Sequence, residues 1–357
     1  MKLRFGIILI LLVVLVSACS TSGIKGSGET ETGIETVIEK KDTYDRSEFV
    51  LGTIVSIRLF EDGSEAILND VFKRLEEIEL KMTFNSDSSE IIEINNNAGI
   101  GQVKVSEDTY AVISAALDYA KKSDGAFDPT IGPLVKLWAI GSDYAKVPAD
   151  LDRLEAVDLT HYSGVLMDKD HYTVHLSQSK MMLDLGAIAK GYASDEVVRI
   201  LQENHISRAI INLGGNVYAY GEKADQQAWK IGIQNPFSIR GEYIGIVSLK
   251  NKSVVTSGIY ERYFEEDGVK YHHLLNTSTG YPIENELASV TIISENSMQA
   301  DALSTVLFAL GVEKGTAFVK THYPEISVVF ITKEKKVFTT QMDSLTVEWT
   351  DNTFEVQ

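Results

Sequence analysis

Segments with helical and strand-like patterns alternate irregularly along this chain, and this mixture constrains its fold more than any other feature. Apolar residues recur at helical spacing from Ala66 to Met82, whereas residues 209–213 and 288–294 are short apolar runs typical of buried strands. Between residues 229 and 256 several strand-like runs follow one another directly. A purely helical fold and a pure β-sandwich are therefore excluded, and the sequence predicts the α+β class.

Capping residues, glycines and prolines set the expected boundaries. Ser106 starts a helix that ends before Gly125, and Ser297 caps a helix that runs through Leu310 and is closed by Gly311. Further helices are expected over 66–82, 151–157 and 186–203. Strands are expected over 49–59, 172–176, 180–183, 209–213, 229–233, 243–249, 253–256, 288–294, 326–332 and 336–339, with 172–176 and 180–183 forming a hairpin.

The charge balance narrows the set of partners. The chain has 357 residues and a formal net charge of −18. Such an acidic surface repels nucleic acid phosphates and anionic lipid headgroups, so nucleic acid is not expected as a partner. An anionic ligand would need a local cation or oriented N–H groups to offset this field.

The first 18 residues have the pattern of an export signal. Two basic residues precede an apolar run from Phe5 to Val16, which is shorter than a membrane span. Small residues then precede Cys19, as in bacterial lipoproteins that are cut ahead of a cysteine whose thiol takes a lipid. An ordinary signal peptide with an incidental cysteine is the alternative. We favour lipidation, because the chain's single cysteine stands at this position.

This interpretation divides the chain into three parts. Residues 1–18 form the signal peptide, residues 19–45 form a flexible tether rich in Gly, Ser, Thr and Glu, and residues 46–350 form the folded domain. A lipid on Cys19 would hold the protein on the extracytoplasmic face of a cell membrane.

The segment Asp184–Gly191, DLGAIAKG, joins a strand-like run to a helix. Its glycines let the backbone approach a ligand, the helix N-terminus offers free N–H groups, and Lys190 adds a positive charge. These features suit a phosphate, although the spacing differs from that of the dinucleotide-binding GxGxxG motif. A plain strand–helix turn with a solvated lysine is the alternative.

Asp301 and Thr305 stand four residues apart in a helical segment, so their oxygen atoms share one face. A carboxylate and a hydroxyl can form part of a site for Mg²⁺, which often takes few protein ligands. In the alternative interpretation Asp301 only stabilises the start of its helix through the dipole.

Three other segments carry side chains suited to ligand binding. Hydroxyl groups and a glycine in Thr256–Gly258 suit phosphate contacts, and the two glycines of 212–217 leave room for a flat ring. His272 and His273 are adjacent on a strand, so they point to opposite faces and only one can face a site as a base. Ordinary turns and exposed strand histidines are the alternatives.

Together and in this order, these segments resemble the ApbE family, whose members are FAD:protein FMN transferases. The resemblance covers roughly Phe49–Leu310. It rests on DLGAIAKGYASD, NLGGN, TSGIYERYF, HHLLNTSTGYP, QADALSTVLFALG and GAFDPTIGPLVKLW. It implies a single T-fold-like α+β catalytic domain that binds FAD as its substrate in a cleft.

The resemblance also implies roles for individual residues. Mg²⁺ would be held by the backbone carbonyl of Ala187 and by the side chains of Asp301 and Thr305. His273 matches the histidine retained in the family and is the candidate catalytic base, with Asp301 as the second candidate. The positions expected to bind the flavin nucleotide are Leu51, Phe84, Ala126, Phe127, Asp128, Asp184, Lys190, Ser257 and Leu274.

The implied reaction moves FMN from FAD onto a Ser or Thr hydroxyl of an acceptor protein and releases AMP. Such an acceptor carries a short Ser/Thr flavinylation motif and is expected to be a membrane or extracytoplasmic redox protein. Two alternatives use the same residues: an Mg²⁺-dependent FAD pyrophosphatase, in which water replaces the protein hydroxyl, and a lipoprotein that binds FAD without turnover.

The sequence departs from the family's pattern at three places. Leu51 stands where the family usually has Met, Phe84 where it often has Tyr, and Asn276-Thr277 where it commonly has Asp-Pro. The loss of a charge at Asn276 is expected to alter turn geometry or flavin affinity without abolishing the site.

Overall fold

The computed structural model describes residues 43–60, 63–343 and 345–357. The predicted signal segment, Cys19 and the tether as far as residue 42 lie outside the described residues. The first described strand begins at Thr43 and the last ends at Val356, so the folded part extends beyond the predicted range 46–350 at both ends.

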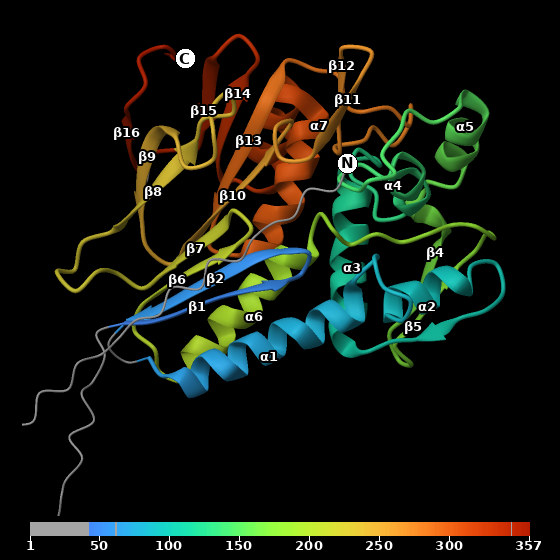
Figure 1. The fold of residues 1–357 in the computed structure, drawn as a ribbon, viewed down its shortest axis with the longest axis horizontal. Helices are drawn as coiled ribbons and strands as arrows, with labels where there is room; N and C mark the ends of the chain where they lie inside the picture. Colours follow the sequence, from blue (N-terminus) through green and yellow to red (C-terminus); the bar gives the residue numbers. More distant parts are fainter. Residues whose placement is uncertain (1–42, 61–62, 344) are drawn as a thin grey trace, which may run out of the picture. The chain divides into compact units, whose positions relative to one another are not determined.

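A nine-stranded sheet forms the centre of the fold (Figure 1), in the order β1-β2-β6-β7-β10-β13-β14-β15-β17. Its neighbouring strands are antiparallel except for β15 and β17. The strands are β1 (Thr43–Val50), β2 (Thr53–Phe60), β6 (Ala209–Leu213), β7 (Asn216–Tyr220), β10 (Lys252–Gly258), β13 (Leu287–Ser294), β14 (Ser327–Thr332), β15 (Lys336–Thr340) and β17 (Glu355–Val356).

Both faces of this sheet are covered, which explains the continuous apolar runs in the sequence. In β10, Val255 packs into the main core with the helices, whereas Val254 packs against a second sheet. Every residue of β13 and β14 is buried for the same reason. The second sheet has the order β16-β9-β8 and consists of β8 (Trp229–Gln234), β9 (Tyr243–Leu249) and β16 (Thr346–Trp349).

Three helices supply the other layer of the core. They are α1 (Glu65–Met82), α6 (Ala189–Glu203) and α7 (Ser297–His322). Helix α7 is long and apolar enough to cross a membrane by length and composition alone. In this fold it is a core helix, because Leu303 and Leu307 are fully buried among residues of the sheet and of α6.

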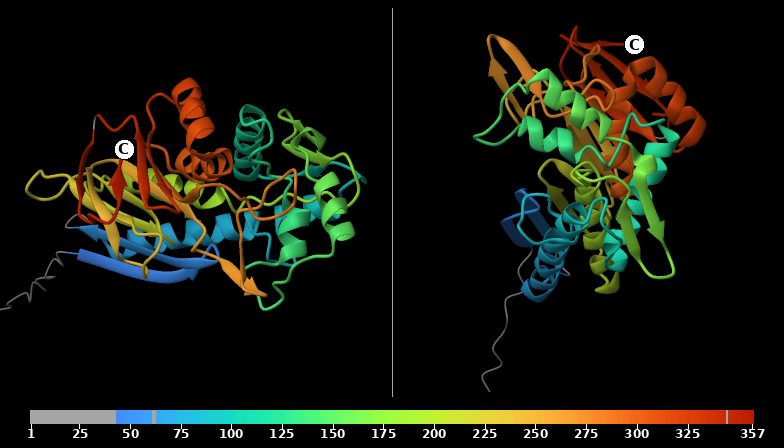
Figure 2. Two further views of the ribbon diagram at one scale, coloured as in Figure 1. Left: turned by 90° about the horizontal axis from the view of Figure 1, so that it is seen from above. Right: turned by 90° about the vertical axis from the view of Figure 1, so that its right-hand side faces the viewer.

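The segment from α2 to β5 lies beside one end of the central sheet, as Figures 1 and 2 both show. It contains α2 (Glu90–Asn96), β3 (Val103–Lys104), α3 (Glu107–Lys122), α4 (Gly132–Trp138), α5 (Asp150–Asp158), a 3₁₀ turn (Tyr162–Gly164), β4 (Val165–Asp168) and β5 (Thr173–Leu176). The remaining two strands, β11 (Tyr263–Glu266) and β12 (Val269–His272), form a separate two-stranded ribbon.

The α+β prediction is confirmed, but four predicted boundaries are wrong. Residues 49–59 are not one strand: the chain turns at Leu51 and Gly52, which have φ of 57° and 67°, and β1 and β2 form a hairpin. Leucine rarely adopts this left-handed conformation, so a turn at this position was not expected. Residues 180–183 form no strand either, because β5 pairs with β3 and β4 instead.

The two helices that flank the predicted site also begin elsewhere. Helix α6 starts at Ala189, not near Gly186. Asn296, not Ser297, caps α7 by accepting a hydrogen bond from the Gln299 N–H. The predicted end of the helix at Gly311 is confirmed: its non-helical backbone, with φ of 76°, interrupts α7, and a second helical stretch follows as far as His322.

The close crossing of α6 and α7 depends on the absence of a side chain at Gly191. A Cβ there would overlap the Ser297 carbonyl and lie 2.6 Å from the Met298 Cα. We expect Gly191→Ala to lower the free energy of unfolding by about 2–4 kcal/mol, because two backbones must separate. Gly101→Ala is the matched control, since nothing lies within 4 Å of its Cβ position. Chemical denaturation measures both; equal stability of the two variants would contradict this packing.

Candidate functional site

One cavity of about 180 Å³ brings together most of the predicted site residues. It lies where loops before α4 and α6, the end of β10, the segment after β12 and helix α7 meet. The predicted residues that line it are Ala126, Phe127, Asp128, Asp184, Ala187, Lys190, Ser257, His273, Leu274, Asp301 and Thr305.

The carboxylate of Asp301 has partners from two other elements of the fold, and its residue is only 4% exposed. One oxygen accepts a hydrogen bond from the Asn216 amide at 3.0 Å and lies 3.4 Å from the Lys190 Nζ. The other oxygen accepts from the Gly191 backbone N–H at 2.9 Å. These donors come from α6 and β7, so Asp301 fixes α7 to both elements.

The hydrogen bond from Gly191 satisfies a free N–H in the first turn of α6. Gly191 is the third residue of α6, and the first N–H groups of a helix have no acceptor within the helix. Its N–H donates to Asp301, and no described group donates to the carbonyl of Ala187, which precedes the helix. Likewise, no hydrogen bond involves the Thr305 hydroxyl in the described part of the chain, although this residue lines the cavity.

These unused oxygens fit a hard cation. A carbonyl, a carboxylate and a hydroxyl are the kinds of ligand that Mg²⁺ accepts, with water and substrate phosphates filling the other positions. No cluster of three or more His, Cys, Asp or Glu suited to a metal occurs among the described residues.

Two other aspartates, the partly buried Asp184 and the buried Asp128, shape the loops of the cavity. The Asp184 carboxylate accepts from the Gly186 N–H at 2.7 Å and so closes the turn that presents Ala187. The Asp128 carboxylate accepts from the Thr130 N–H at 2.8 Å and from the Tyr162 N–H at 2.7 Å. Burial raises the pKa of both carboxyl groups.

His273 and His272 point to opposite faces, as expected from their positions in the chain. His273 lines the cavity, and its Nδ1 lies 3.2 Å from the Arg262 carbonyl oxygen. Burial and the positive charge of Arg262 lower the pKa of His273 to about 3. His272 lies outside the cavity lining, with its Nε2 3.1 Å from the Ile283 carbonyl oxygen. His273 is therefore neutral near pH 7 and able to accept a proton.

Ser257 reaches the cavity from the end of β10, not from a loop after it, because β10 extends to Gly258. Its hydroxyl lies 2.7 Å from that of Ser304, which donates to the Asp301 carbonyl at 2.7 Å. Ser257 is thus tied to the same turn of α7 that carries Asp301.

Leu51 and Phe84 are not among the residues that line this cavity. Leu51 lies in the turn between β1 and β2, and Phe84 follows α1; both are partly buried against the main core. Their assignment to the flavin site came from the resemblance alone. Leu51 and Phe84 therefore do not share this cavity with the other predicted residues.

Several residues of the site were missed from the sequence. Arg262, Trp138 and Thr277 line the cavity, and Asn216 holds Asp301. All four lie within the segments on which the resemblance rests. No spacing in the sequence marks an arginine, a tryptophan or an asparagine as a site residue. These residues are therefore identified only by the three-dimensional arrangement.

The replacement at Asn276 leaves the turn intact. Its Oδ1 accepts hydrogen bonds from the backbone N–H groups of Ser278 and Thr279, both at 2.9 Å. A carboxylate oxygen would accept the same bonds. The Thr277 hydroxyl donates to the Gly125 carbonyl at 2.7 Å and joins this turn to the loop before α4. The departure therefore removes a charge at residue 276 and adds, through Thr277, a hydrogen bond that a proline could not make.

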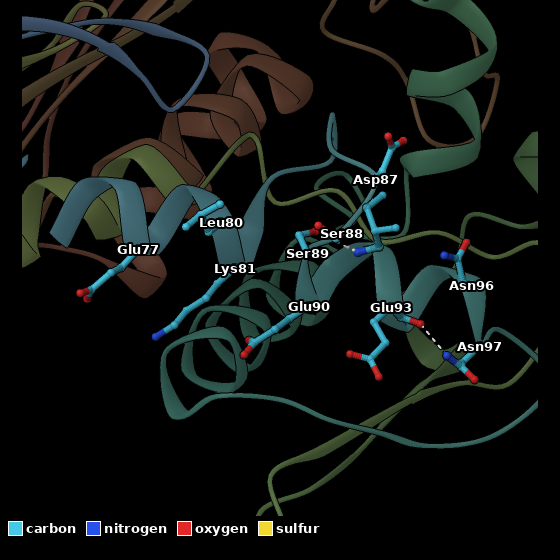
Figure 3. Close-up of a pocket in the computed structure, with 11 residues that line it drawn as sticks. Glu77, Leu80, Lys81, Asp87, Ser88, Ser89, Glu90, Glu93, Asn96 and Asn97 are labelled. Atoms are coloured by element: carbon cyan, nitrogen blue, oxygen red, sulfur yellow. Dashed lines mark hydrogen bonds between the residues drawn. The ribbon is translucent and has the colours of Figure 1, made fainter. Parts of the chain in front are cut away.

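A larger hollow of about 650 Å³ lies between α1 and α2 and contains none of the predicted site residues. Figure 3 shows Glu77 and Lys81 on α1 facing it, with Glu90 and Glu93 on α2. Its lining holds four carboxylates and one amine. That balance would repel a diphosphate, so the smaller cavity around Asp301 is the candidate active site.

Comparison with known proteins shows the family to which the chain belongs. The family model described as "ApbE family" matches residues 51–330. A FAD:protein FMN transferase from Klebsiella pneumoniae is 39% identical over 313 residues, which is 88% of this chain and 96% of the relative. One from Treponema pallidum is also 39% identical, over 82% of this chain and 86% of the relative. The chain belongs to the ApbE family.

Solved structures support the same fold. The ApbE protein from Thermotoga maritima is 33% identical and superposes with a TM-score of 0.74, over 87% of this chain and 97% of its own. The flavin transferase ApbE from Vibrio cholerae is 27% identical, with a TM-score of 0.75 over 84% of this chain and 97% of its own.

The surroundings of His273 give a direct prediction for its protonation. With a pKa of about 3, its imidazole should stay neutral as the pH falls from about 8 to about 5. Its ring C–H resonances in the ligand-free protein should therefore not move over this range, and the His273→Gln spectrum identifies them. A titration centred near pH 6.5 would show that the ring is solvated and would contradict the arrangement.

Proposed function

We propose that this protein transfers FMN from FAD to a Ser or Thr hydroxyl of an acceptor protein, with Mg²⁺ as cofactor. The observation that carries the proposal is the arrangement around Asp301. Unused oxygens of Ala187 and Thr305, two cationic side chains and a neutral histidine all line one cavity. Relatives named FAD:protein FMN transferase share most of the chain with it.

Ala187, Asp301 and Thr305 would hold the cation. When bound, Mg²⁺ neutralises charge on the diphosphate of FAD and stabilises the AMP leaving group. Lys190 would turn from Asp301 toward the anionic substrate, because its amine and the cation would compete for the same carboxylate oxygen. Arg262 adds a second positive charge at the other wall of the cavity.

The chemistry at the chain's own residues concerns one proton. The acceptor hydroxyl oxygen forms a bond to the phosphorus atom on the FMN side, the bond from that phosphorus to the bridging oxygen breaks, and AMP leaves. The hydroxyl proton passes to a base, for which His273 is the first candidate and Asp301 the second. A diphosphate bound beside His273 would raise its pKa and make it a stronger base.

The expected location of the protein suits a partner outside the cytoplasm. We propose that Cys19 carries a lipid and that residues after it tether the domain to the membrane surface. The acceptor would then be a membrane or extracytoplasmic redox protein with a Ser/Thr flavinylation motif. The support for this part is the sequence pattern of residues 1–45.

Incubation of the full chain with FAD, Mg²⁺ and extracytoplasmic proteins of the same cell tests the activity. Mass spectrometry should find a protein with FMN esterified to a Ser or Thr and one AMP released for each ester. Free FMN and AMP without any labelled protein would instead indicate the pyrophosphatase. FAD binding with no AMP at any Mg²⁺ concentration would indicate a flavin-binding lipoprotein.

Removal of the Asp301 carboxylate should abolish the effect of the metal. We expect Asp301→Ala to lower Mg²⁺-dependent AMP release at least about 100-fold, since one of few cation ligands is lost. Asp301→Asn, which keeps the side-chain shape, should behave in the same way. Asp118→Ala is the control, because that aspartate is exposed on α3, lies outside the cavity lining and pairs with Lys122. Wild-type turnover in both Asp301 variants would remove this residue from the metal site.

A further inference from the structure

The base of the β11–β12 ribbon forms part of the cavity wall. Arg262 precedes β11, His273 follows β12, and both residues line the cavity. The His273 N–H donates to the Arg262 carbonyl at 3.1 Å, so this pair continues the ladder of the ribbon by one rung. The ribbon and the candidate active site therefore share one continuous piece of backbone.

The pairing of β11 with β12 shows which side chains face the cavity. Arg262, Phe264, Tyr271 and His273 lie on one face, because side chains alternate along each strand and these residues form matching pairs. The rings of Tyr271 and Phe264 pack on Trp138, with centroids 5.5 and 6.3 Å away. Trp138 also lines the cavity, so this face of the ribbon is continuous with the cavity wall.

The outer edge of β11 is open. Asp267 and Gly268 form the two-residue turn, with φ of 52° and 77°, so the flanking residues Glu266 and Val269 form a hydrogen-bonded pair. By alternation the N–H and C=O groups of Tyr263 and Glu265 point away from β12. Both residues are exposed, and no described strand pairs with this edge.

The other sheet edges in the described part of the chain are less well placed to bind a segment that must reach the cavity. The outer edge of β12 is not free where the chain continues past His273, because the Ile283 N–H donates there to the Leu274 carbonyl at 2.9 Å. The outermost strands of the three larger sheets are β1, β17, β16, β8, β3 and β4. None of them contains a residue of the cavity lining or directly adjoins one.

We propose that the hydroxyl-bearing segment of the acceptor protein binds in extended form as a third strand of this ribbon, beside β11. This inference rests on the proposed transferase function, which requires a protein hydroxyl at the cavity. A strand paired with Tyr263 and Glu265 passes Arg262 at the base of the ribbon and continues over the cavity. Alternate side chains of that strand face the same side as Arg262 and His273, which is where the hydroxyl is needed.

Recognition of this kind uses the main chain of the partner more than its side chains. The open edge of β11 supplies two N–H and two C=O groups from Tyr263 and Glu265, as an edge strand does for an added strand. A short motif with one essential Ser or Thr is sufficient for such binding. The other side chains of the segment contribute through their fit along the ribbon.

Glu265→Pro tests the proposal on the enzyme. Proline removes the outward N–H of residue 265 without breaking the β11–β12 ladder, because that N–H is not part of the ladder. The probe is a synthetic peptide that spans the residue labelled by the wild-type protein. We expect the KM for this peptide to rise about tenfold or more, while FAD affinity and thermal stability stay at wild-type values.

The matched control is Ser47→Pro. Ser47 is exposed on the edge strand β1. Its N–H also points away from the neighbouring strand, because residues alternate between facing that strand and facing outward, counted from the Leu51-Gly52 turn. This control should leave the KM for the peptide unchanged. An equal KM in wild type and Glu265→Pro would overturn the proposal.

A second experiment does not depend on the folding of any variant. Methylation of single backbone nitrogens in the peptide should raise KM at alternate positions only, because alternate N–H groups of a strand face its neighbour. Equal KM values at all positions would overturn strand addition. A wild-type protein that labels no acceptor would refute the transferase function itself, so the two failures are distinguishable.

Discussion

The buried carboxylate of Asp301 organises the site and the packing around it. It accepts hydrogen bonds from the Gly191 backbone and the Asn216 amide and lies beside the Lys190 amine, so it joins α7 to α6 and β7. A buried carboxylate is unfavourable unless such partners compensate for lost hydration. The Ala187 carbonyl precedes α6, receives no hydrogen bond from a described group and is available to a ligand. The interaction that stabilises the crossing of two helices thus lies in the same cavity as this free carbonyl.

The fold places this crossing where substrates can reach it. Core layers on both faces of the central sheet fix β10 and β13, against which α7 packs. Loops from the segment between α3 and α6 close the cavity from the other side, held by the carboxylates of Asp128 and Asp184. The β11–β12 ribbon completes the wall with Arg262 and His273. Residues from five separate stretches of sequence therefore meet at one cavity.

The sequence predicted the fold class from periodicity, whereas most of the predicted cavity lining followed from the resemblance to the ApbE family. Helices such as Glu65–Met82 and the i, i+4 pair Asp301 and Thr305 follow from spacing alone. The Leu51-Gly52 turn was missed because a leucine adopts a left-handed conformation there. The helix end at Gly311 was predicted correctly, but not the second helical stretch that follows it. Asn216 was missed because its role consists of one hydrogen bond between segments distant in the chain. Leu51 and Phe84, named from resemblance, lie outside the cavity lining.

The central claim is that Ala187 and Asp301 share one cation beside the diphosphate of FAD. Anomalous diffraction from a crystal of the protein with FAD and Mn²⁺ in place of Mg²⁺ tests this most directly. The account predicts one peak at bonding distance, about 2.0–2.3 Å, from the Ala187 carbonyl oxygen and an Asp301 carboxylate oxygen. A peak elsewhere, with Asp301 still bound to Asn216 and Lys190 and Ala187 without a ligand, would contradict it.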